Sequence, residues 1–346
     1  MKKSLLKKVV AIVLTCTFIL GIGIETRTNV VAGETPVDEQ IGIMQGNCGK
    51  SAMWEFDSNT GILTIRGTGE VTLPDLGNLQ NAAKTLIIKK GIMSIGEGAF
   101  SNYRISKLEI EEGVQRIEKD AFWSCDNLSK VVIPKSVTYI GYNSFYECDS
   151  LKKFTILGDV KLGGNPFCCM APETLRLAGK CDNLGQMFFS EESSVSKIKL
   201  INGNKNYIKK NGMLLTKDKK TLVLYYGKKN TLKVPATVTK IDNYACCSNY
   251  INKLVLNKKT KIIGKYAFDR SGLTSLTINK NLKKIKEGAF YGNNIQKIKF
   301  NKKIKYIGKS AFDDNNFDSV KLYNHPIIKK EAFGSAKIKY VKKNKK

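Results

Sequence analysis

The chain has 346 residues and a formal net charge of +28, from 58 lysine and arginine residues against 30 aspartate and glutamate residues. Its single histidine excludes a two-histidine metal site. The charge is unevenly distributed, because residues 196–346 hold 37 basic and 8 acidic residues whereas residues 33–195 hold 16 and 21. This asymmetry indicates an anionic partner, although a lysine-rich genome would produce the same excess without one.

The first predicted element is an export signal. Four lysines in the first eight residues precede an apolar run from Val9 to Ile24, and Ala32 stands at the expected cleavage site. These features are typical of a secretory signal peptide over residues 1–32. A retained membrane anchor is the alternative, but the run is shorter than the ~20 residues of a spanning helix. No later stretch is apolar enough to span a membrane, so we expect a secreted protein, either free or associated with the cell surface.

Residues 33–83 are predicted to form a polar leader and a small β module. Two β-prone runs, Trp54–Phe56 and Ile62–Ile65, flank a segment of turn-forming residues, which favours a hairpin. We expect Gly67 and Gly69 to close the module. Its expected role is to cover the first coil of the repeats that follow, because a terminal repeat otherwise leaves apolar surface exposed.

From residue 84 onward the chain repeats with a period of 22 or 23 residues. An Ala-Phe pair or a variant of it recurs, and the apolar residues ahead of it alternate as they do along a strand. The marker positions are Phe100, Phe122, Phe145, Phe167, Phe189, Cys246, Phe268, Phe290, Phe312 and Phe333. Since one unit is too small to bury its own apolar face, this period predicts a β-rich solenoid of about ten coils.

The repeat pattern is interrupted over residues 202–231. Asn211-Gly212 and the polar run Lys217–Lys220 separate β-prone stretches, which predicts a β-hairpin or meander inserted into the solenoid. The repeats are therefore divided into a first block, residues 84–201, and a second block, residues 232–346, which is rich in lysine and ends in a basic tail.

The repeat unit is similar to that of a known family. The segment Leu128–Leu151 reads LSKVVIPKSVTYIGYNSFYECDSL and closely resembles the BspA-type leucine-rich repeat, which occurs in exported bacterial proteins. The resemblance covers nearly all of the chain after the signal peptide. It implies a leucine-rich-repeat solenoid with a parallel sheet on its concave face, a role in adhesion and binding, and no catalytic residue. In three coils the proline of the motif is replaced, by Asn257, Asn279 and Asn301.

In six coils the third position after the marker carries a small or polar side chain. It is Cys125 and Cys148 in two coils, and Asn or Ser in later coils, namely Asn249, Ser271, Asn293 and Asn315. A position that accepts these residue types is predicted to face a tight inner turn, where the side chain packs or bonds to the backbone. A disulfide between Cys125 and Cys148 in stacked coils is the alternative. No cysteine spacing matches a zinc site.

The strongest functional candidate is the lysine array. Outward lysines on the strands would be brought ~4.8 Å apart by stacking of the coils, and we call this predicted set the lysine ladder: Lys197, Lys199, Lys253, Lys297, Lys299, Lys321, Lys337 and Lys339. A second set in the turns is called the basic ridge: Lys258, Lys259, Lys261, Lys280, Lys283, Lys284, Lys302, Lys303 and Lys305. Charges this dense repel one another, and screening over ~8 Å relieves the repulsion only in part. An anionic ligand is therefore indicated.

We predict a monomeric, non-catalytic binding or adhesion protein without metal or cofactor. Its expected partner is an anionic cell-wall polymer, a glycan, or a host or surface protein. Nucleic acid would bind only non-specifically through phosphate, because no aromatic-basic recognition motif is present. The alternative is a structural component of the bacterial surface that makes protein–protein contacts. The isolated His325 leaves a hydrolase as a remote third reading.

Overall fold

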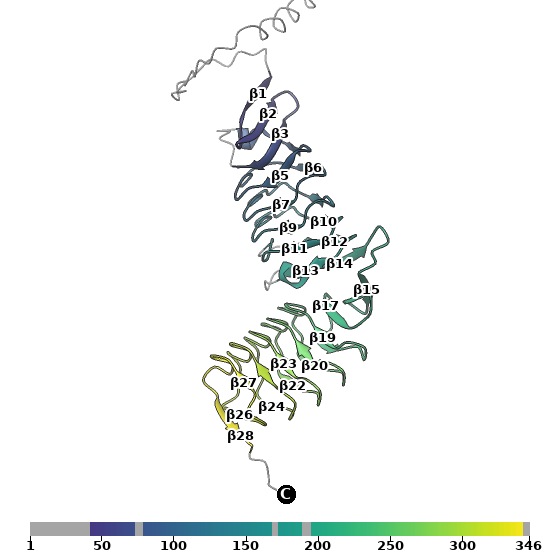
Figure 1. Ribbon diagram of the computed structural model, residues 1–346, viewed down its shortest axis with the longest axis vertical. Helices are drawn as coiled ribbons and strands as arrows, with labels where there is room; N and C mark the ends of the chain where they lie inside the picture. Colours follow the sequence, from purple (N-terminus) through teal and green to yellow (C-terminus); the bar gives the residue numbers. More distant parts are fainter. Residues whose placement is uncertain (1–41, 73–78, 168–171, 189–194, 342–346) are drawn as a thin grey trace, which may run out of the picture. The chain divides into compact units, whose positions relative to one another are not determined.

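The computed structural model describes residues 42–72, 79–167, 172–188 and 195–341. The predicted signal peptide, residues 33–41 of the predicted leader, the marker Phe189 and the pair Cys168-Cys169 lie outside the described residues. Figure 1 shows strands from β1 to β28 following one another through the described part of the chain. The described residues also include a four-residue helix, α2 (Leu79–Ala82), and a 3-10 helix, η1 (Leu184–Phe188).

The amino-terminal module is an antiparallel sheet of three strands. β1 (Ile43–Asn47) pairs with β2 (Ser51–Asp57), and β2 pairs with β3 (Ile62–Val71). Trp54 lies opposite Ile65, which confirms the predicted hairpin. β3 then pairs in parallel with the two strands of the first coil, β4 (Thr85–Ile88) and β5 (Ile92–Ile95). The module therefore covers the start of the repeats.

Gly67 and Gly69 do not close the module, contrary to the prediction. Both lie within β3, and the pairing register shifts immediately after Gly69. Their φ angles are 108° and 85°, values that glycine adopts at no steric cost. A Cβ at Gly67 would lie 2.2 Å from the carbonyl oxygen of Ser51. The glycines therefore let β3 bend, so that one strand pairs with both β4 and β5.

Each coil contributes two short strands rather than one, and these build two columns of parallel strands. The first column of the first block contains β4, β6 (Lys107–Ile110), β8 (Lys130–Ile133), β10 (Lys153–Ile156), β12 (Thr174–Leu177) and β14 (Lys197–Leu200). The second contains β5, β7 (Arg116–Ile117), β9 (Tyr139–Ile140), β11 (Val160–Leu162) and β13 (Cys181–Asp182). The neighbours in each column are 21 to 23 residues apart, as in the register that places Phe154 beside Val131.

The second block repeats this arrangement. Its first column contains β18 (Thr231–Lys233), β20 (Lys253–Val255), β22 (Ser275–Thr277) and β24 (Ile298–Lys299), followed by the separate pair β26 (Ser319–Leu322) and β28 (Lys337–Tyr340). Its second column contains β19 (Lys240–Ile241), β21 (Ile262–Ile263), β23 (Lys284–Ile285), β25 (Tyr306–Ile307) and β27 (Ile327–Ile328). The solenoid predicted from the period is therefore confirmed, with two parallel columns in place of one sheet.

Stacked marker phenylalanines form the centre of each block. Phe290 is fully buried, and its ring centroid lies 5.4 Å from that of Phe268 and 5.0 Å from that of Phe312. Aromatic pairs at such distances stabilise a fold by about 0.5–1.5 kcal/mol beyond the burial of their surface. Phe100 and Phe122 stack in the same way in the first block, at 5.7 Å. The periodic marker of the sequence is thus an internal aromatic column.

The predicted insertion is a meander of three antiparallel strands, β15 (Tyr207–Lys210), β16 (Met213–Thr216) and β17 (Thr221–Tyr225). Asn211 and Gly212 have φ angles of 49° and 73°, as a two-residue hairpin turn requires. β17 also pairs in parallel with β19. The meander is therefore an integral layer of the second block's sheet.

The side chains of the meander divide between two hydrophobic cores. Leu214 and Leu224 belong to the core of the first block, whereas Leu215, Leu222 and Tyr225 belong to the core of the second. Tyr225 also occupies a marker position, because its N–H donates to the carbonyl of Ala245 as Phe268 N–H does to Ala289. This role cannot be recognised in the sequence, because a tyrosine takes the place of the phenylalanine and the insertion interrupts the 22-residue spacing.

Candidate anion-binding surface

The predicted lysine ladder is exposed throughout, but the pairing register aligns little of it. Lys321 on β26 lies opposite Lys339 on β28. In the column from β18 to β24, the row that contains Lys299 reads Lys233, Val255, Thr277 and Lys299. On the other strands, Lys197 lies beside Thr174, Lys199 beside Arg176, Lys253 between Thr231 and Ser275, Lys337 beside Ser319, and Lys297 precedes β24. The predicted lysine ladder is therefore not continuous, because the neighbouring coils carry residues other than lysine at most of the aligned positions.

The basic ridge is brought together more closely. Lys283 N–H donates to the carbonyl of Lys261 at 2.9 Å, and Lys305 N–H donates to that of Lys283 at 2.8 Å. These three lysines therefore occupy the same place in three successive coils. All ridge side chains are exposed: Lys258, Lys259, Lys261, Lys280, Lys283, Lys284, Lys302, Lys303 and Lys305.

Asparagine side chains hold the turns that carry the ridge. Asn257 Nδ2 donates to the carbonyls of Pro235 and Val238, while its Oδ1 accepts from Lys259 N–H at 2.6 Å. Asn301 Nδ2 likewise donates to the carbonyl of Asn279 at 2.7 Å. Where the motif has proline, these coils fix the turn by side-chain bonds to the backbone, as asparagine does in Asx turns. The ridge therefore has an ordered backbone.

The ridge ends in a pocket of about 540 Å³ between the last coils. Four lysines line it, Lys283, Lys302, Lys303 and Lys305, together with Ile304, Asn324, His325, Pro326 and Ile327. Its lining contains no carboxylate. Asn324 Nδ2 donates to the carbonyl of Lys302 at 2.8 Å. We call this pocket the basic pocket. It places His325 beside the ridge, with its ring stacked on Tyr340 at 4.3 Å between centroids.

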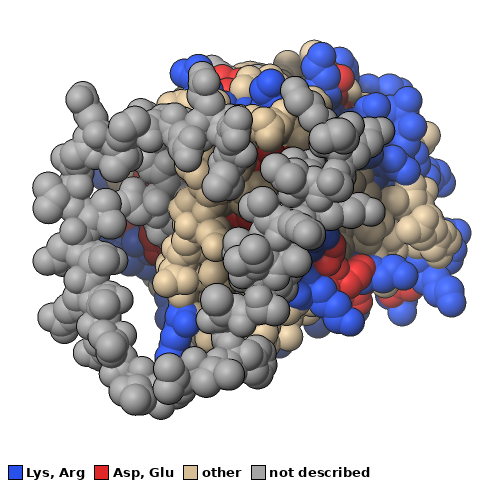
Figure 2. Space-filling view, turned by 90° about the horizontal axis from the view of Figure 1, so that it is seen from above, with Lys and Arg blue, Asp and Glu red and all other residues tan. Residues whose placement is uncertain are grey.

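The ridge and ladder lysines lack the ion pairs that other lysines have. Lys240 pairs with Asp242 and Lys265 pairs with Glu287, each at 2.8 Å. Among the described residues, no carboxylate lies within ion-pair distance of any ladder or ridge lysine. Figure 2 shows Lys and Arg side chains gathered at the upper right edge of the molecule in that view. The positive charge is thus left for solvent or a ligand.

Neighbouring lysines influence one another where they are partly buried. The pKa of Lys286 is lowered, first by burial and then by the charges of Lys240 and Lys284. The pKa of Lys265 is raised, chiefly by its hydrogen bond to Glu287. Burial and neighbouring positive charge thus disfavour the charged form of Lys286, whereas the adjacent carboxylate favours that of Lys265.

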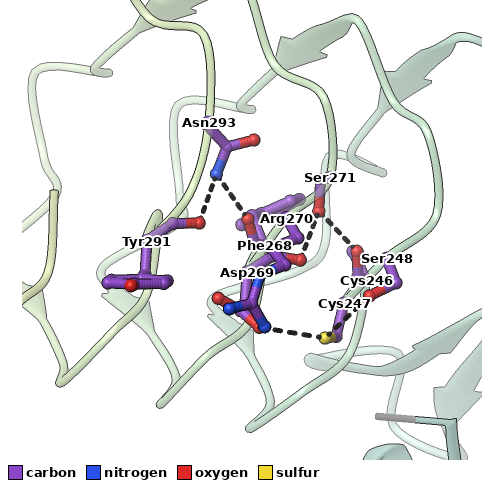
Figure 3. Close-up of polar contacts among 9 residues, drawn as sticks. All are labelled: Cys246, Cys247, Ser248, Phe268, Asp269, Arg270, Ser271, Tyr291 and Asn293. Carbon is purple, nitrogen blue, oxygen red and sulfur yellow. Dashed lines mark hydrogen bonds and ion pairs between the residues drawn. The ribbon is translucent and has the colours of Figure 1, made fainter. Parts of the chain in front are cut away.

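The inner turns contain a second polar array, which is structural. Cys125 Sγ donates to the carbonyl of Phe100 at 3.2 Å and Cys148 Sγ to that of Phe122 at 3.3 Å. Ser271 and Asn293 bond in the same way to the carbonyls of Cys246 and Phe268, both at 2.7 Å (Figure 3). The prediction for the third position is confirmed: each side chain bonds to the marker carbonyl of the preceding coil.

The cysteines of the described residues are free and buried. Burial raises the pKa of Cys48 to about 11 and that of Cys148 to about 12, so both remain thiols at neutral pH. Figure 3 also shows Cys247, whose Sγ lies 3.6 Å from Oδ2 of the buried Asp269. Its pKa is raised too, first by burial and then by the charge of Asp269. Such thiols are poor nucleophiles.

The described residues offer neither a metal site nor a membrane-spanning helix. In this part of the chain no group of three or more His, Cys, Asp and Glu side chains is arranged to hold a metal ion. The described residues also contain no helix long and apolar enough to cross a membrane.

The stacked coils and their internal phenylalanine columns define a β-solenoid repeat protein. The chain belongs to the BspA-type leucine-rich repeat family, whose repeat matches six times over residues 78–168 and 230–346, more than half of the chain. The expected fold class and the stated resemblance are thereby confirmed.

A solved structure shows the same fold. The crystal structure of the pneumococcal vaccine antigen PcpA is 19% identical, with a TM-score of 0.57 over 88% of this chain and 89% of that one. A leucine rich cell surface protein from Faecalibacterium prausnitzii is 16% identical, with a TM-score of 0.48 over 87% and 96%. A leucine-rich repeat protein from Eubacterium ventriosum is 19% identical, with a TM-score of 0.47 over 85% and 77%. Comparison with curated proteins gave no match.

Proposed function

We propose that this chain is an exported, non-catalytic binding protein whose basic ridge and basic pocket engage an anionic polymer. Membership of the BspA-type leucine-rich repeat family and the signal-like amino terminus support a role at the cell surface or outside the cell. The pneumococcal vaccine antigen PcpA has the same fold. The ligand classes that fit are an anionic wall polymer, a sulfated or acidic glycan, and an acidic surface protein.

The basic pocket is the observation that carries this proposal. It gathers four lysines from two successive turns around about 540 Å³, and its lining contains no carboxylate. Lysine ammonium groups are strongly hydrated point charges that bind phosphate, sulfate and carboxylate without a fixed geometry. The column Lys261, Lys283 and Lys305 extends the charge along successive coils. A linear polyanion would follow that direction and contact several lysines at once.

Salt-dependent retention on immobilised heparin tests the proposal. The test variant carries Lys→Gln at the four lysines that line the basic pocket. The matched control carries Lys→Gln at four exposed lysines of the meander region, Lys205, Lys210, Lys217 and Lys220, and has the same net charge. Because each lost phosphate- or sulfate-like contact lowers the salt dependence of binding, we expect the pocket variant to elute at much lower salt than the control. Equal elution of the two variants would show that only net charge matters.

The ladder lysines form a separate test of the same proposal. Lys297 and Lys299 lie on the strand side of the turn that carries Lys302 and Lys303. Replacing Lys297 and Lys299 by Gln should weaken heparin retention less than replacing Lys302 and Lys303, because only the latter pair lines the basic pocket. A larger loss of heparin retention in the Lys297 and Lys299 variant would indicate that the polyanion binds the strand face rather than the basic pocket.

A further inference from the structure

Exposed apolar side chains gather on the outermost strands of the described chain. β1 carries Ile43 and Met44, which are 55% and 40% exposed. β28 carries Ile338 and Tyr340, which are 39% and 44% exposed. Val341, which directly follows β28, is 41% exposed. Apolar surface in contact with water is unfavourable. Burial of these side chains against another surface would therefore be favourable at both β1 and β28.

On β28 the exposed residues occupy core positions. Ile338 lies opposite Val320, and Tyr340 lies opposite Leu322, on the preceding strand β26. Val320 and Leu322 are almost fully buried, at 1% and 0% exposed. β28 pairs only with β26 among the described strands. The stack therefore presents an open coil at this edge, with its inward positions uncovered.

β1 presents the second open edge. It pairs with β2 on one side and with no other described strand. Unpaired N–H and C=O groups along such a strand are a template for pairing with another chain. Apolar residues on the same strand would add buried surface to those hydrogen bonds. Both edges therefore offer the two components of strand addition, backbone pairing and apolar contact.

The two edges differ in charge. β28 contains Lys337 and Lys339, and both side chains are exposed. On β2, which pairs with β1, Asp57 lies opposite Ile43 and Glu55 lies opposite Gln45. Two β28 edges would repel each other, whereas β28 and the β1 end would attract. Charge complementarity thus favours the β1 edge of a second copy of the chain as the binding partner of the β28 edge.

We propose that β28 of one copy docks against β1 of a second copy, so that the chains associate head to tail through their sheet edges. The contact joins two different surfaces, so it leaves a free edge at each end and extends into an open chain of subunits. It is independent of the basic pocket and departs from the monomer expected from sequence. A surface protein that assembles in this way would present its pockets in a repeating array.

Sedimentation velocity of two edge variants tests this contact. Met44→Asp blocks the β1 edge, and Ile338→Asp blocks the β28 edge. Met93→Asp is the control, because Met93 is 50% exposed on β5, away from both edges. We expect the wild-type chain and Met93→Asp to gain mass with concentration, and to gain less at high salt. Each edge variant alone should remain monomeric.

A mixture of the two edge variants gives the decisive result. The intact β28 edge of Met44→Asp can meet the intact β1 edge of Ile338→Asp, so an equimolar mixture should form a dimer and stop there. A wild-type chain that stays monomeric at every concentration would overturn the proposal. Self-association of Met44→Asp alone would also overturn it, because that variant could associate only tail to tail. Ile43→Asp and Tyr340→Asp form a second pair, so the conclusion does not rest on one substitution at each edge.

Discussion

The inner-turn bonds of Asn293 offer a measurable link between the repeat pattern and stability. Asn293 is 3% exposed and makes three hydrogen bonds to backbone. Its Nδ2 donates to the carbonyls of Phe268 at 2.7 Å and Tyr291 at 3.1 Å, and its Oδ1 accepts from Leu273 N–H at 2.9 Å. Figure 3 shows the two donated bonds. Asn293→Ala would leave all three backbone groups without this partner.

The expected cost follows from the number of bonds. A buried hydrogen bond contributes about 1 kcal/mol net, and an unsatisfied buried group costs about 1–3 kcal/mol, so Asn293→Ala should lower the free energy of unfolding by about 3 kcal/mol or more. Asn293→Ser should lower it by about 2 kcal/mol, because serine can restore only the bond to the Phe268 carbonyl, as Ser271 does to Cys246 at 2.7 Å.

The assay is equilibrium urea unfolding followed by far-ultraviolet circular dichroism, with Asn294→Ala as the control. Asn294 is exposed, and its side chain makes a contact of 3.5 Å with Asn316, so its loss should cost less than about 0.5 kcal/mol. Amide hydrogen exchange at Leu273 should rise in Asn293→Ala, since that N–H loses its acceptor. Equal costs for Asn293→Ala and Asn294→Ala would refute the assignment of the inner turn as a structural array.

Three further predictions concern the core, the turns and the thiols. Phe290→Ala should cost about 3–5 kcal/mol, because it leaves a cavity between two stacked rings, whereas Tyr250→Ala, at a side chain that is 63% exposed, should cost far less in the same urea assay. Gly288→Ala should cost at least ~1–2 kcal/mol from its left-handed conformation alone, since φ is 57° and a Cβ would lie 2.2 Å from the Tyr266 ring; an unchanged urea midpoint would contradict this. The raised pKa of Cys148, about 12, predicts that iodoacetamide at pH 8 labels its peptide only after unfolding, as mass spectrometry can measure; rapid labelling of the folded chain would show that the thiol is neither buried nor protonated.

The sequence alone determined the repeating elements of this protein. Each coil carries its own alternating apolar residues and its own marker, so a period near 22 residues was enough to predict the solenoid, its buried phenylalanines and the polar third position. The Asn211-Gly212 turn of the meander was equally local, since its two φ angles belong to those residues. The BspA-type resemblance rested on the same local motif, and the family match confirms it.

Only the tertiary structure decided which side chains lie beside one another in different coils. The ladder lysines share an outward direction, but the pairing register places Val255 and Thr277 between Lys233 and Lys299. The basic pocket arises from turns of three coils, and its residues are far apart in sequence. The two-sided meander and the bend of β3 at Gly67 likewise depend on neighbours that stacking supplies. The repeat period of the sequence determines which residues each coil contains. The pairing register between strands and the geometry of the turns are set by packing between coils, and they determine which side chains lie together on the surface.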